Sequence, residues 1–547
     1  MRYCSLRIVR KKFTGTLLAC CIICNSVAWA QKPIQANKPN ILWFIAEDIS
    51  PYLAYYGDST IKTPNLDRLA REGIIYKNVF DVSGVCAPSR SCLITGMYPT
   101  SIGTNNMRTL KTYPQAWIPD YSVVLPPKVK MFSELMRING YYCTNNSKQD
   151  YQFVAPLSGW SESSGKAHWR NRPAGMPFFS VFTFNVTHES QIWEKKNDPL
   201  LVDPAKVPVP PYYPDSPVIR KDLARMYSNI IEMDKQVGEK LKQLEDDRLL
   251  DNTIIIWFSD NGGPLPRGKR EIYDTGLHIP MIIRFPDKRH SATVNEDLIS
   301  FVDFAPTTLS LAGIKIPGYM QGVAFSGIEK GKPRKYIYAA RDRMDSEYDM
   351  VRAVRDNRFK YIKNFQPEKP YIQNIAYRKQ MGIMNELLRY EKEGKLNKVQ
   401  SLWFRKSKAP EELYDTEADP YEFHNLASDP KYLKKLNELR SELADWMKKV
   451  DDKGFIPEKE WVERMWPGMI QPVTAQPEFY IQSGAFLIKS ATGGASISYQ
   501  VVNKGQNPDK KAWKVYQHPI KINENEKIIA VAERIGFKSS IITEITL

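Results

Sequence analysis

The chain has 547 residues, of which 25% are charged, and a formal net charge of +16 at pH 7. This length is too great for one hydrophobic core, so we expect two or three domains. The surplus of basic residues favours anionic partners, but no basic cluster is interleaved with base-stacking aromatic residues, which argues against nucleic acid as the partner.

Residues 1–30 have the three parts of a secretory signal peptide. A basic start, "MRYCSLRIVRKK", precedes the apolar run "FTGTLLACCIIC", and "AWA" is a small-x-small cleavage site. We expect an exported protein that begins at Gln31 and is periplasmic in a Gram-negative host, without a lipid anchor because the apolar run before "LLAC" is short. Cleavage removes five basic residues and no acidic ones, which lowers the charge from +16 to +11. No later stretch has the roughly 18 apolar residues that a membrane span needs.

Four of the seven cysteines lie in the signal peptide, which leaves Cys86, Cys92 and Cys143 in the mature chain. Three cysteines are too few for a disulfide framework in a protein of this length. Cys92 and Cys143 are therefore either two buried thiols or one bridge, and their spacing does not decide between these alternatives.

Strands and helices alternate between residues 40 and 286. The run "NILWFIAED" (40–48) predicts a buried strand that ends in two carboxylates, and residues 63–73 predict a helix with Thr63 as N-cap and Gly73 as its stop. A strand at 176–184, a helix at 221–249 and strands at 253–259 and 279–286 follow. This alternation predicts an α/β fold with a large mixed, mostly parallel sheet that helices cover on both faces.

The pattern changes after about residue 335. We expect residues 31–335 to form the main α/β domain and residues 336–468 a smaller antiparallel α+β subdomain. A helix at 430–449 should close that subdomain, with Asp429 as N-cap and an apolar face of Leu433, Leu436, Leu439, Leu443 and Trp446. Residues 469–547 predict a linker and an appended small β-sandwich.

Polar residues follow two of the predicted parallel strands. Glu47 and Asp48 end the first strand, and Asp260 and Asn261 end the strand at 253–259. Ligands collect at the carboxyl ends of parallel strands, and a set of oxygen donors suits a hard cation, so we expect Ca²⁺ here, or less favourably Mg²⁺. Each pair alone could instead cap a helix.

The segment "VCAPSRSCLITG" (85–96) reads as a loop with two cysteines, and its "CAPSR" followed by "LITG" resembles the signature of the formylglycine-dependent (type I) sulfatases of the alkaline phosphatase superfamily. Seven further segments fall in the family's order between residues 38 and 450, among them "TPNLDRLAREG", "PFFSVFTFNVTHE" and "GKREIYDTGLHIPMIIRFP". The resemblance implies that a formylglycine-generating maturase, reading Pro88 and Arg90 in the unfolded chain, oxidises Cys86 to Cα-formylglycine. Its hydrate would attack the sulfur of a sulfate ester.

The resemblance also assigns roles to individual residues. It implies that Glu47, Asp48, Asp260, Asn261 and the modified Cys86 hold the metal, with Glu47 standing where aspartate is commoner in the family. It implies that Arg90, Lys148 and Lys269 hold the nucleophile and the sulfate oxygens, and that His188 donates a proton to the leaving oxygen.

One position departs from the family pattern. Asp150 stands where the family has a histidine that helps to deprotonate the nucleophile. Asp150 could accept that proton itself, His168 could replace the missing histidine, or the activity could be weakened or lost.

The candidates for substrate binding are polar and aromatic residues in loops near the strand ends, namely Asn105, Arg108, Asp150, His168, Trp169, Arg170 and Arg343. The β-sandwich after residue 469 resembles the C-terminal module of some chitobiases and sulfatases. The expected substrate is a sulfate ester on polysaccharide-derived oligosaccharides, which a mature charge of +11 would attract. The alternatives are a sulfamate hydrolase, a phosphomonoester or phosphonate hydrolase, which "CAPSR" disfavours, and a catalytically impaired sugar-sulfate-binding relative. The oligomeric state stays open.

Overall fold

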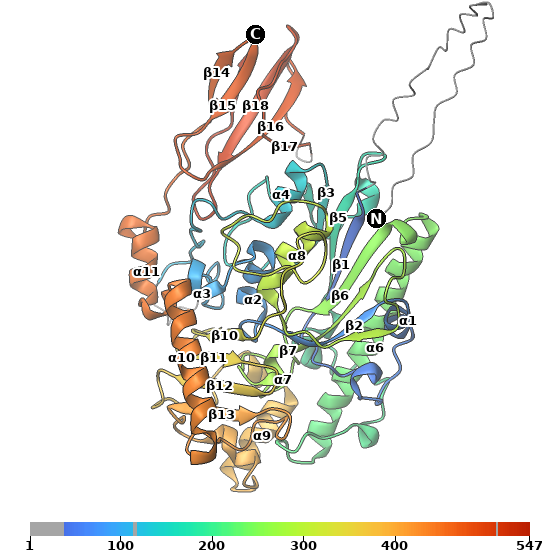
Figure 1. The fold of residues 1–547 in the computed structure, drawn as a ribbon, viewed down its shortest axis with the longest axis vertical. Coiled ribbons are helices and arrows are strands. Elements are labelled where there is room, and N and C mark those ends of the chain that lie inside the picture. The colour runs from blue at the N-terminus through green and yellow to red at the C-terminus, as the bar shows by residue number, and fades with distance from the viewer. Residues whose placement is uncertain (1–37, 113–117, 510–511) are drawn as a thin grey trace, which may run out of the picture. The chain divides into compact units, whose positions relative to one another are not determined.

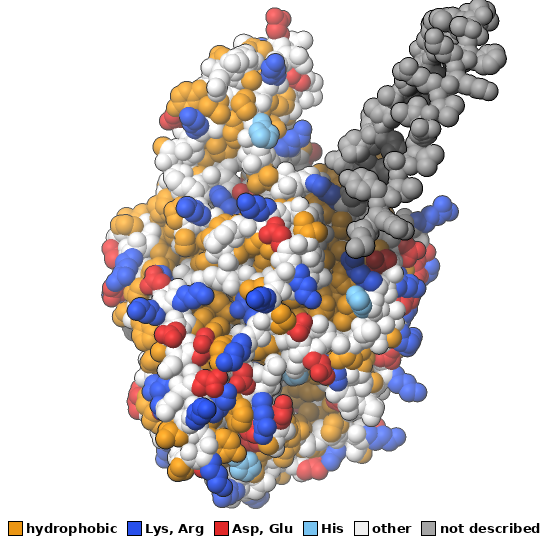
Figure 2. All heavy atoms as spheres, in the orientation of Figure 1, with side chains coloured by type: hydrophobic (Ala, Val, Ile, Leu, Met, Phe, Trp, Pro, Cys, Tyr) orange, Lys and Arg blue, Asp and Glu red, His pale blue; other side chains and the backbone are white. Residues whose placement is uncertain are grey.

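The computed structural model describes residues 38–112, 118–509 and 512–547 (Figure 1). The predicted signal peptide lies outside the described residues. Among the residues that are described, no helix combines the length and apolar character that crossing a membrane requires. Lys and Arg side chains are intermixed with Asp and Glu over the face drawn in Figure 2 and do not gather there into one basic patch.

Within the described ranges, nine strands form the largest sheet: β1 (Asn40–Ala46), β2 (Ile74–Phe80), β3 (Tyr142–Asn146), β4 (Glu162–Ser163), β5 (Phe178–Phe184), β6 (Thr253–Ser259), β7 (His278–Arg284), β8 (Thr293–Asn295) and β9 (Ile299–Ser300). Their order is β4-β3-β5-β1-β6-β7-β2-β8, with β9 paired to β2. The run from β4 to β6 is parallel, whereas β7 is antiparallel to both β6 and β2. The predicted mixed, mostly parallel sheet is confirmed.

The helices of the described chain are α1 (Pro64–Glu72), α2 (Cys86–Thr95), α3 (Pro99–Ile102), α4 (Phe132–Ile138), α5 (Gln191–Glu194), α6 (Pro217–Asp246), α7 (Asp274–Leu277), α8 (Phe304–Leu311), α9 (Gly382–Lys392), α10 (Leu433–Val450) and α11 (Glu458–Met465). The predicted helix at 63–73 is α1, which follows Thr63 and buries Leu66, Leu69 and Ala70. The predicted helix at 221–249 is α6, which starts four residues earlier.

The central strand β1 is buried on both faces, and its alternate side chains enter two different cores. Trp43 and its neighbours on one face pack with α2, α4 and α8, and Trp43 contacts Phe132 and Phe304. Phe44 and its neighbours on the other face pack with α1 and α6. Helices therefore cover both faces, as the sequence predicts.

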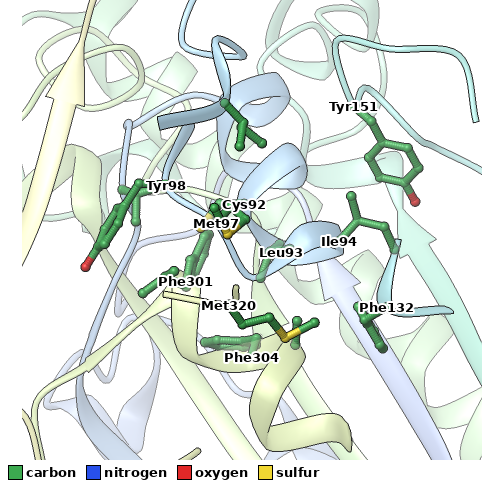
Figure 3. Close-up of a cluster of buried hydrophobic side chains, with 14 of the residues drawn as sticks. Cys92, Leu93, Ile94, Met97, Tyr98, Phe132, Tyr151, Phe301, Phe304 and Met320 are labelled. Atoms are coloured by element: carbon green, nitrogen blue, oxygen red, sulfur yellow. The ribbon is translucent and has the colours of Figure 1, made fainter. Parts of the chain in front are cut away.

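Figure 3 shows the core beneath α2, where Cys92 lies among Met97, Phe301 and Met320. Cys86, Cys92 and Cys143 are all buried free thiols. Of the two alternatives for Cys92 and Cys143, separate buried thiols is the one that the structure contains.

Four antiparallel strands follow the large sheet, in the order β10 (Ile337–Arg341), β11 (Val351–Arg355), β12 (Phe359–Asn364) and β13 (Glu411–Asp415). Helix α10 packs on β11 and β12 (Figure 1). Asp429 caps the short turn before α10 by accepting a bond from the N–H of Lys431 at 2.9 Å. The prediction that Leu433 lies on the buried face is wrong, since its side chain is 54% exposed; at about 100° per residue it falls well outside the stripe that the other four residues form.

The C-terminal residues form two antiparallel sheets, which we call the C-terminal β module (residues 478–546). One pairs β14 (Glu478–Gln482) with β15 (Ala485–Lys489), and the other contains β16 (Ser496–Asn503), β17 (Lys514–Val515), β18 (Glu526–Glu533) and β19 (Thr543–Thr546). Phe486, Ile488, Ile528 and Ala530 form a small core of their own. The strands β16 and β18 contain the alternating sequences "SISYQVV" and "KIIAVAE".

Candidate active site

Cys86 is the first residue of α2, a helix whose ten residues are all buried. The expectation that residues 85–96 form a loop is wrong. Pro88 is compatible with the helix because it lies in the first turn, where a backbone N–H has no partner within the helix. Gly96 ends the helix at φ 67°, and its N–H donates to the carbonyl of Cys92 at 2.8 Å. The nucleophile candidate is thus held at the start of a regular element, with 3% exposure.

The four predicted oxygen ligands meet at the carboxyl ends of β1 and β6, which are parallel neighbours. The backbone N–H of Asp48 donates to Asp260 Oδ1 at 3.2 Å, and Asn261 Nδ2 donates to Asp48 Oδ1 at 2.9 Å. Glu47, Asp48, Asp260 and Asn261 are each at most 1% exposed. Asp48 has a φ of 54°, a left-handed conformation that is uncommon outside glycine and that frequently accompanies functional sites.

Three predicted cations pair with these carboxylates. Arg90, on the same helix as Cys86, donates from Nε to Asp260 at 2.9 Å and from Nη2 to Glu47 at 3.1 Å. Lys148 Nζ lies 2.7 Å from Glu47 Oε2, and Lys269 Nζ lies 2.7 Å from Asp48 Oδ2. Burial opposes the charge of Lys269, but the neighbouring Asp48 and Glu189 carboxylates raise its pKa above the ordinary value, so it is protonated.

The surroundings of Cys86 disfavour its thiolate. Burial raises the pKa of the Cys86 thiol to about 11, because it outweighs the lowering by Lys148 and Lys269. An unmodified Cys86 is therefore a neutral thiol at neutral pH and a weak nucleophile.

His188 follows β5, and its Nε2 lies 3.9 Å from Glu47 Oε2. Its Nδ1 accepts from the backbone N–H of Ser190 at 3.3 Å, which leaves the ring proton of the neutral form on Nε2. Burial, together with the charges of Lys269 and Lys148, lowers the pKa of His188 to about 2. The predicted role as proton donor thus needs added negative charge beside these lysines, and an anionic ligand would supply it.

Sequence reasoning missed Glu189, Arg270 and Tyr377, which lie close to the predicted residues His188, Lys269 and Arg108. Glu189 forms a bidentate pair with Arg270 at 2.7 and 2.8 Å, and Arg270 also contacts Asp345 at 3.2 Å. The predicted Arg108 joins this chain through Asp345 at 2.8 Å and lies over the ring of Tyr377, 5.4 Å from its centroid. Glu189 and Arg270 could have been found because each directly follows a predicted residue, whereas Tyr377 lies in a segment without any signal.

Asp150 also lies beside Cys86, with a 44% exposed side chain and Oδ2 3.4 Å from Lys148 Nζ. Burial raises the pKa of Asp150, but the charges of Lys148 and Arg90 outweigh it and hold the pKa below the usual value. Asp150 is therefore an ionised carboxylate next to the nucleophile candidate, with access to solvent.

The segment 168–170 lies against α6 instead of at the strand ends. Trp169 is fully buried on Phe178 and Phe182 of β5. Its indole N–H and Arg170 Nε both donate to Asp247 at 2.8 Å, and His168 Nε2 lies 3.1 Å from Gln243 Oε1. The structure therefore does not bring these three predicted residues to Cys86, and His168 is held away from the place of the missing histidine.

Two further substrate candidates have internal partners. Arg343 is fully buried and forms a bidentate pair with Glu458 at 2.6 and 2.7 Å. Asn105 is 6% exposed and donates to Asp342 at 2.8 Å. Arg343 also donates to the backbone carbonyl of Asp345 at 2.6 Å, but its charge is paired with Glu458. Of the predicted substrate residues, only Arg108 and Asp150 therefore bring a charged group to the site.

The site lies within a recognised family match. The model of the family described as "Sulfatase" matches residues 39–166 and 167–314, which is half of the chain. The chain belongs to the sulfatase family. A second model, described as "N-sulphoglucosamine sulphohydrolase, C-terminal", matches residues 267–397 of the sulfatase.

Relatives support the same assignment. The sulfatase is 45% identical to an "Ulvan-active sulfatase" of Formosa agariphila, over 99% of this chain and 98% of that protein. It is 25% identical to the human "N-sulphoglucosamine sulphohydrolase", over 76% of this chain and 91% of that protein. Among solved structures, a phosphonate monoester hydrolase from Silicibacter pomeroyi has a TM-score of 0.56 at 18% identity and covers 76% of this chain and 97% of its own. The last likeness shows the fold alone.

The residues of the sulfatase fit a divalent cation at the ends of β1 and β6. The three carboxylates pair with Arg90, Lys148 and Lys269, and among the described residues no group of three or more His, Cys, Asp or Glu side chains, these carboxylates included, is arranged to hold a metal ion. Yet Asn261 Oδ1 is buried without a hydrogen-bond partner and is free to accept a cation. All four side chains offer oxygen, which suits Ca²⁺ or Mg²⁺.

Charge balance supports the same fit. We call the ion-paired groups around Cys86 the charged cluster: five cations (Arg90, Arg108, Lys148, Lys269 and Arg270) and six carboxylates (Glu47, Asp48, Asp150, Glu189, Asp260 and Asp345). With every group ionised, the cluster carries one net negative charge, which repels a sulfate. A divalent cation makes it net positive by one charge, which matches one sulfate monoester.

Proposed function

We propose that this sulfatase is exported and hydrolyses sulfate esters of polysaccharide-derived oligosaccharides, with the oxidised form of Cys86 as nucleophile. The observation that carries the proposal is the placement of Cys86 at the start of α2 within the charged cluster, beside Lys148 and Lys269. As hydrated formylglycine, position 86 would supply a hydroxyl nucleophile that can later release sulfate by returning to the aldehyde. Glu47, Asp48, Asp260 and Asn261 would hold Ca²⁺, which would screen the sulfate charge and align its oxygens.

The other residues bind and orient the sulfate and move protons. Lys148 and Lys269 are protonated and fixed by carboxylates, so they present positive charge to sulfate oxygens without reorganisation. Arg90 holds the start of α2 against β1 and β6 by pairing with Glu47 and Asp260. A bound sulfate would offset the two lysine charges and raise the pKa of His188, which could then protonate the leaving oxygen from Nε2.

The substrate is best sought among sulfated algal polysaccharides. The relative that is 45% identical over nearly the whole chain carries the name "Ulvan-active sulfatase". Ulvan is therefore the first polysaccharide to test, and the mature charge of +11 suits such a polyanion.

A sulfamate is the second candidate. It is favoured by the match of residues 267–397 to the C-terminal model of N-sulphoglucosamine sulphohydrolase. Release of sulfate from O-sulfated and from N-sulfated glucosamine, measured side by side with ulvan oligosaccharides, separates the two. An aryl phosphonate in the same panel tests the phosphonate alternative.

The nucleophile is tested by mass spectrometry and by two matched variants. Native protein should contain a Cys86 peptide in which H₂S has been exchanged for one oxygen, and Cys86→Ser should bind the oligosaccharide without releasing sulfate. Cys92→Ala, which changes a buried thiol in the same helix, should keep the activity of the folded protein. Full turnover by Cys86→Ser, or an unmodified Cys86 in active native protein, would refute the proposal.

A further inference from the structure

A pocket of about 410 Å³ lies between the large sheet's edge strand β4 and the C-terminal β module. Its wall on the sheet side includes Gln149, Leu157, Ser163 and Lys166, and Trp513 of the module forms part of the other wall. Trp513 precedes β17, which contacts α4 (Figure 1). The volume falls within the range of about 300–1,000 Å³ that is typical of small-molecule sites.

Hydrogen bonds fix the two walls of this pocket to each other. Arg137, at the end of α4, donates to the carbonyl of Leu157 at 2.6 Å and to the carbonyl of Trp513 at 2.5 Å. The backbone N–H of Leu157 in turn donates to Glu533 of β18 at 2.6 Å. The backbone at Trp513 is therefore fixed across the pocket, which lowers part of the entropic cost of stacking a ligand on its ring.

Close packing fixes the module as a whole. Lys130 Nζ donates to the carbonyl of Gly494 and to Ser496 Oγ at 2.8 and 2.7 Å, and Ser496 Oγ donates to Glu134 at 2.8 Å. A methyl group added at Gly494 would lie 2.5 Å from the carbonyl oxygen of Pro127. At Gly494 the backbone of the module therefore packs directly against the backbone of Pro127, with no room for a side chain between them.

One segment of the chain, residues 148–150, contributes to both the charged cluster and the pocket. Gln149 lines the pocket and lies between Lys148 and Asp150, which flank Cys86. Its Nε2 donates to Ser163 Oγ at 2.8 Å, so the same segment joins the cluster to the β4 wall. The side chain of Asp150 is 44% exposed, so the residue that follows Gln149 is open to solvent.

We propose that Trp513 and this pocket bind a sugar unit of the glycan next to the unit that carries the cleaved sulfate. The lining includes Trp513 together with Ser161, Ser163, Ser164 and Gln149, and an aromatic ring combined with hydroxyl and amide groups suits the apolar face and the hydroxyls of a sugar. Lys166 is exposed on the same wall and favours an anionic sugar. The C-terminal β module then belongs to the substrate site, and this inference rests on the proposed function.

The test compares a long and a short substrate. Trp513→Ala should lower kcat/KM for ulvan oligosaccharides about tenfold, which corresponds to roughly 1.4 kcal/mol of lost stacking, and act mainly on KM. The same variant should leave kcat/KM for a small aryl sulfate unchanged, because that substrate does not reach the pocket. Trp513→Phe should retain most of the activity, and Tyr480→Ala, which removes a 47% exposed aromatic ring of the module outside the pocket, should have no effect.

Direct binding separates this inference from the proposed function. Calorimetry of ulvan oligosaccharides with Cys86→Ser should show about tenfold weaker binding when Trp513→Ala or Lys166→Ala is added, whether or not the wild type releases sulfate. Loss of sulfate release with this binding difference intact would overturn the proposed reaction and leave the pocket standing. Equal binding by all three proteins, or an equal loss of kcat/KM for long and short substrates, would overturn the pocket. Lys166→Ala keeps the test decisive if Trp513→Ala does not fold.

Discussion

Calcium should stabilise this sulfatase far more at mildly alkaline than at mildly acidic pH. Burial raises the pKa of Glu47 from 4.5 to about 7, against the opposing charge of Lys148. In the metal-free protein the folded carboxyl therefore binds a proton more tightly than the unfolded chain does, and the stability that this proton contributes is lost as the pH rises through about 7. A cation in the same place needs the carboxylate, so the proton and the cation compete.

The size of the effect follows from the pKa of Glu47. At about pH 5.5 the proton weakens the apparent affinity for Ca²⁺ about thirtyfold relative to about pH 8, because only some 3% of the Glu47 carboxyl is ionised. With excess Ca²⁺ at both pH values, the gain in unfolding free energy should then differ by about 2 kcal/mol. Tm measured by fluorescence in EDTA and in excess CaCl₂, at constant ionic strength, reports this difference.

Two variants identify the carboxyl that is responsible. Glu47→Gln should weaken the effect of Ca²⁺ and remove its dependence on pH. Asp222→Asn should preserve both, although burial raises the pKa of Asp222 to about 6, because this carboxyl accepts from the N–H of Ile383 on α9, outside the charged cluster. An equal Ca²⁺ effect at both pH values in the wild type would refute the assignment of Glu47 to the cation.

Three further substitutions test the site and its support. Lys269→Met should lower kcat/KM for sulfate release about 10²- to 10³-fold in protein that is still folded; wild-type kinetics would remove Lys269 from the site. Arg343→Met breaks a buried pair with Glu458 and should lower the free energy of unfolding by roughly 3–5 kcal/mol. The KM of the folded variant should be unchanged, and a raised KM would show that Arg343 does bind substrate. Gly276→Ala puts a methyl group against two backbone carbonyl oxygens of the loop that carries Lys269, so kcat/KM should fall about 100-fold, whereas an unchanged value would show that the loop can adjust.

The sequence was most informative for elements whose spacing of apolar residues, together with the residues at their ends, indicates both their type and which side chains are buried. The run at 40–46 contains only residues that suit a strand buried on both faces, and α1 has Pro64 in its first turn and Gly73 after its end. Because β1 and β6 are parallel neighbours, the side chains that follow them had to meet, and Glu47, Asp48, Asp260 and Asn261 do lie together. Strand-end chemistry could therefore be predicted without coordinates.

Contacts between distant segments could not be predicted in this way. Nothing in the sequence pairs Arg343 with Glu458, 115 positions later, or Trp169 with Asp247, yet these partners decide that both side chains face inward. Tyr377 reaches Arg108 only through the packing of two long loops. The expectation of a loop at residues 85–96 was also wrong, and the serine and threonine hydroxyls of this segment bond backbone carbonyls of the same segment in α2.

The complete burial of α2 has a consequence for how active enzyme is made. If Cys86 is oxidised as we propose, the modifying enzyme would have to reach the chain on both sides of it, and in the folded protein that residue is 3% exposed within a helix that has no exposed face. Folding and oxidation would then compete for the same newly made chains, and their relative rates, not an equilibrium, would set the active fraction. A chain that folds first would stay folded but inactive, so rapid synthesis would raise the yield of protein and lower its specific activity.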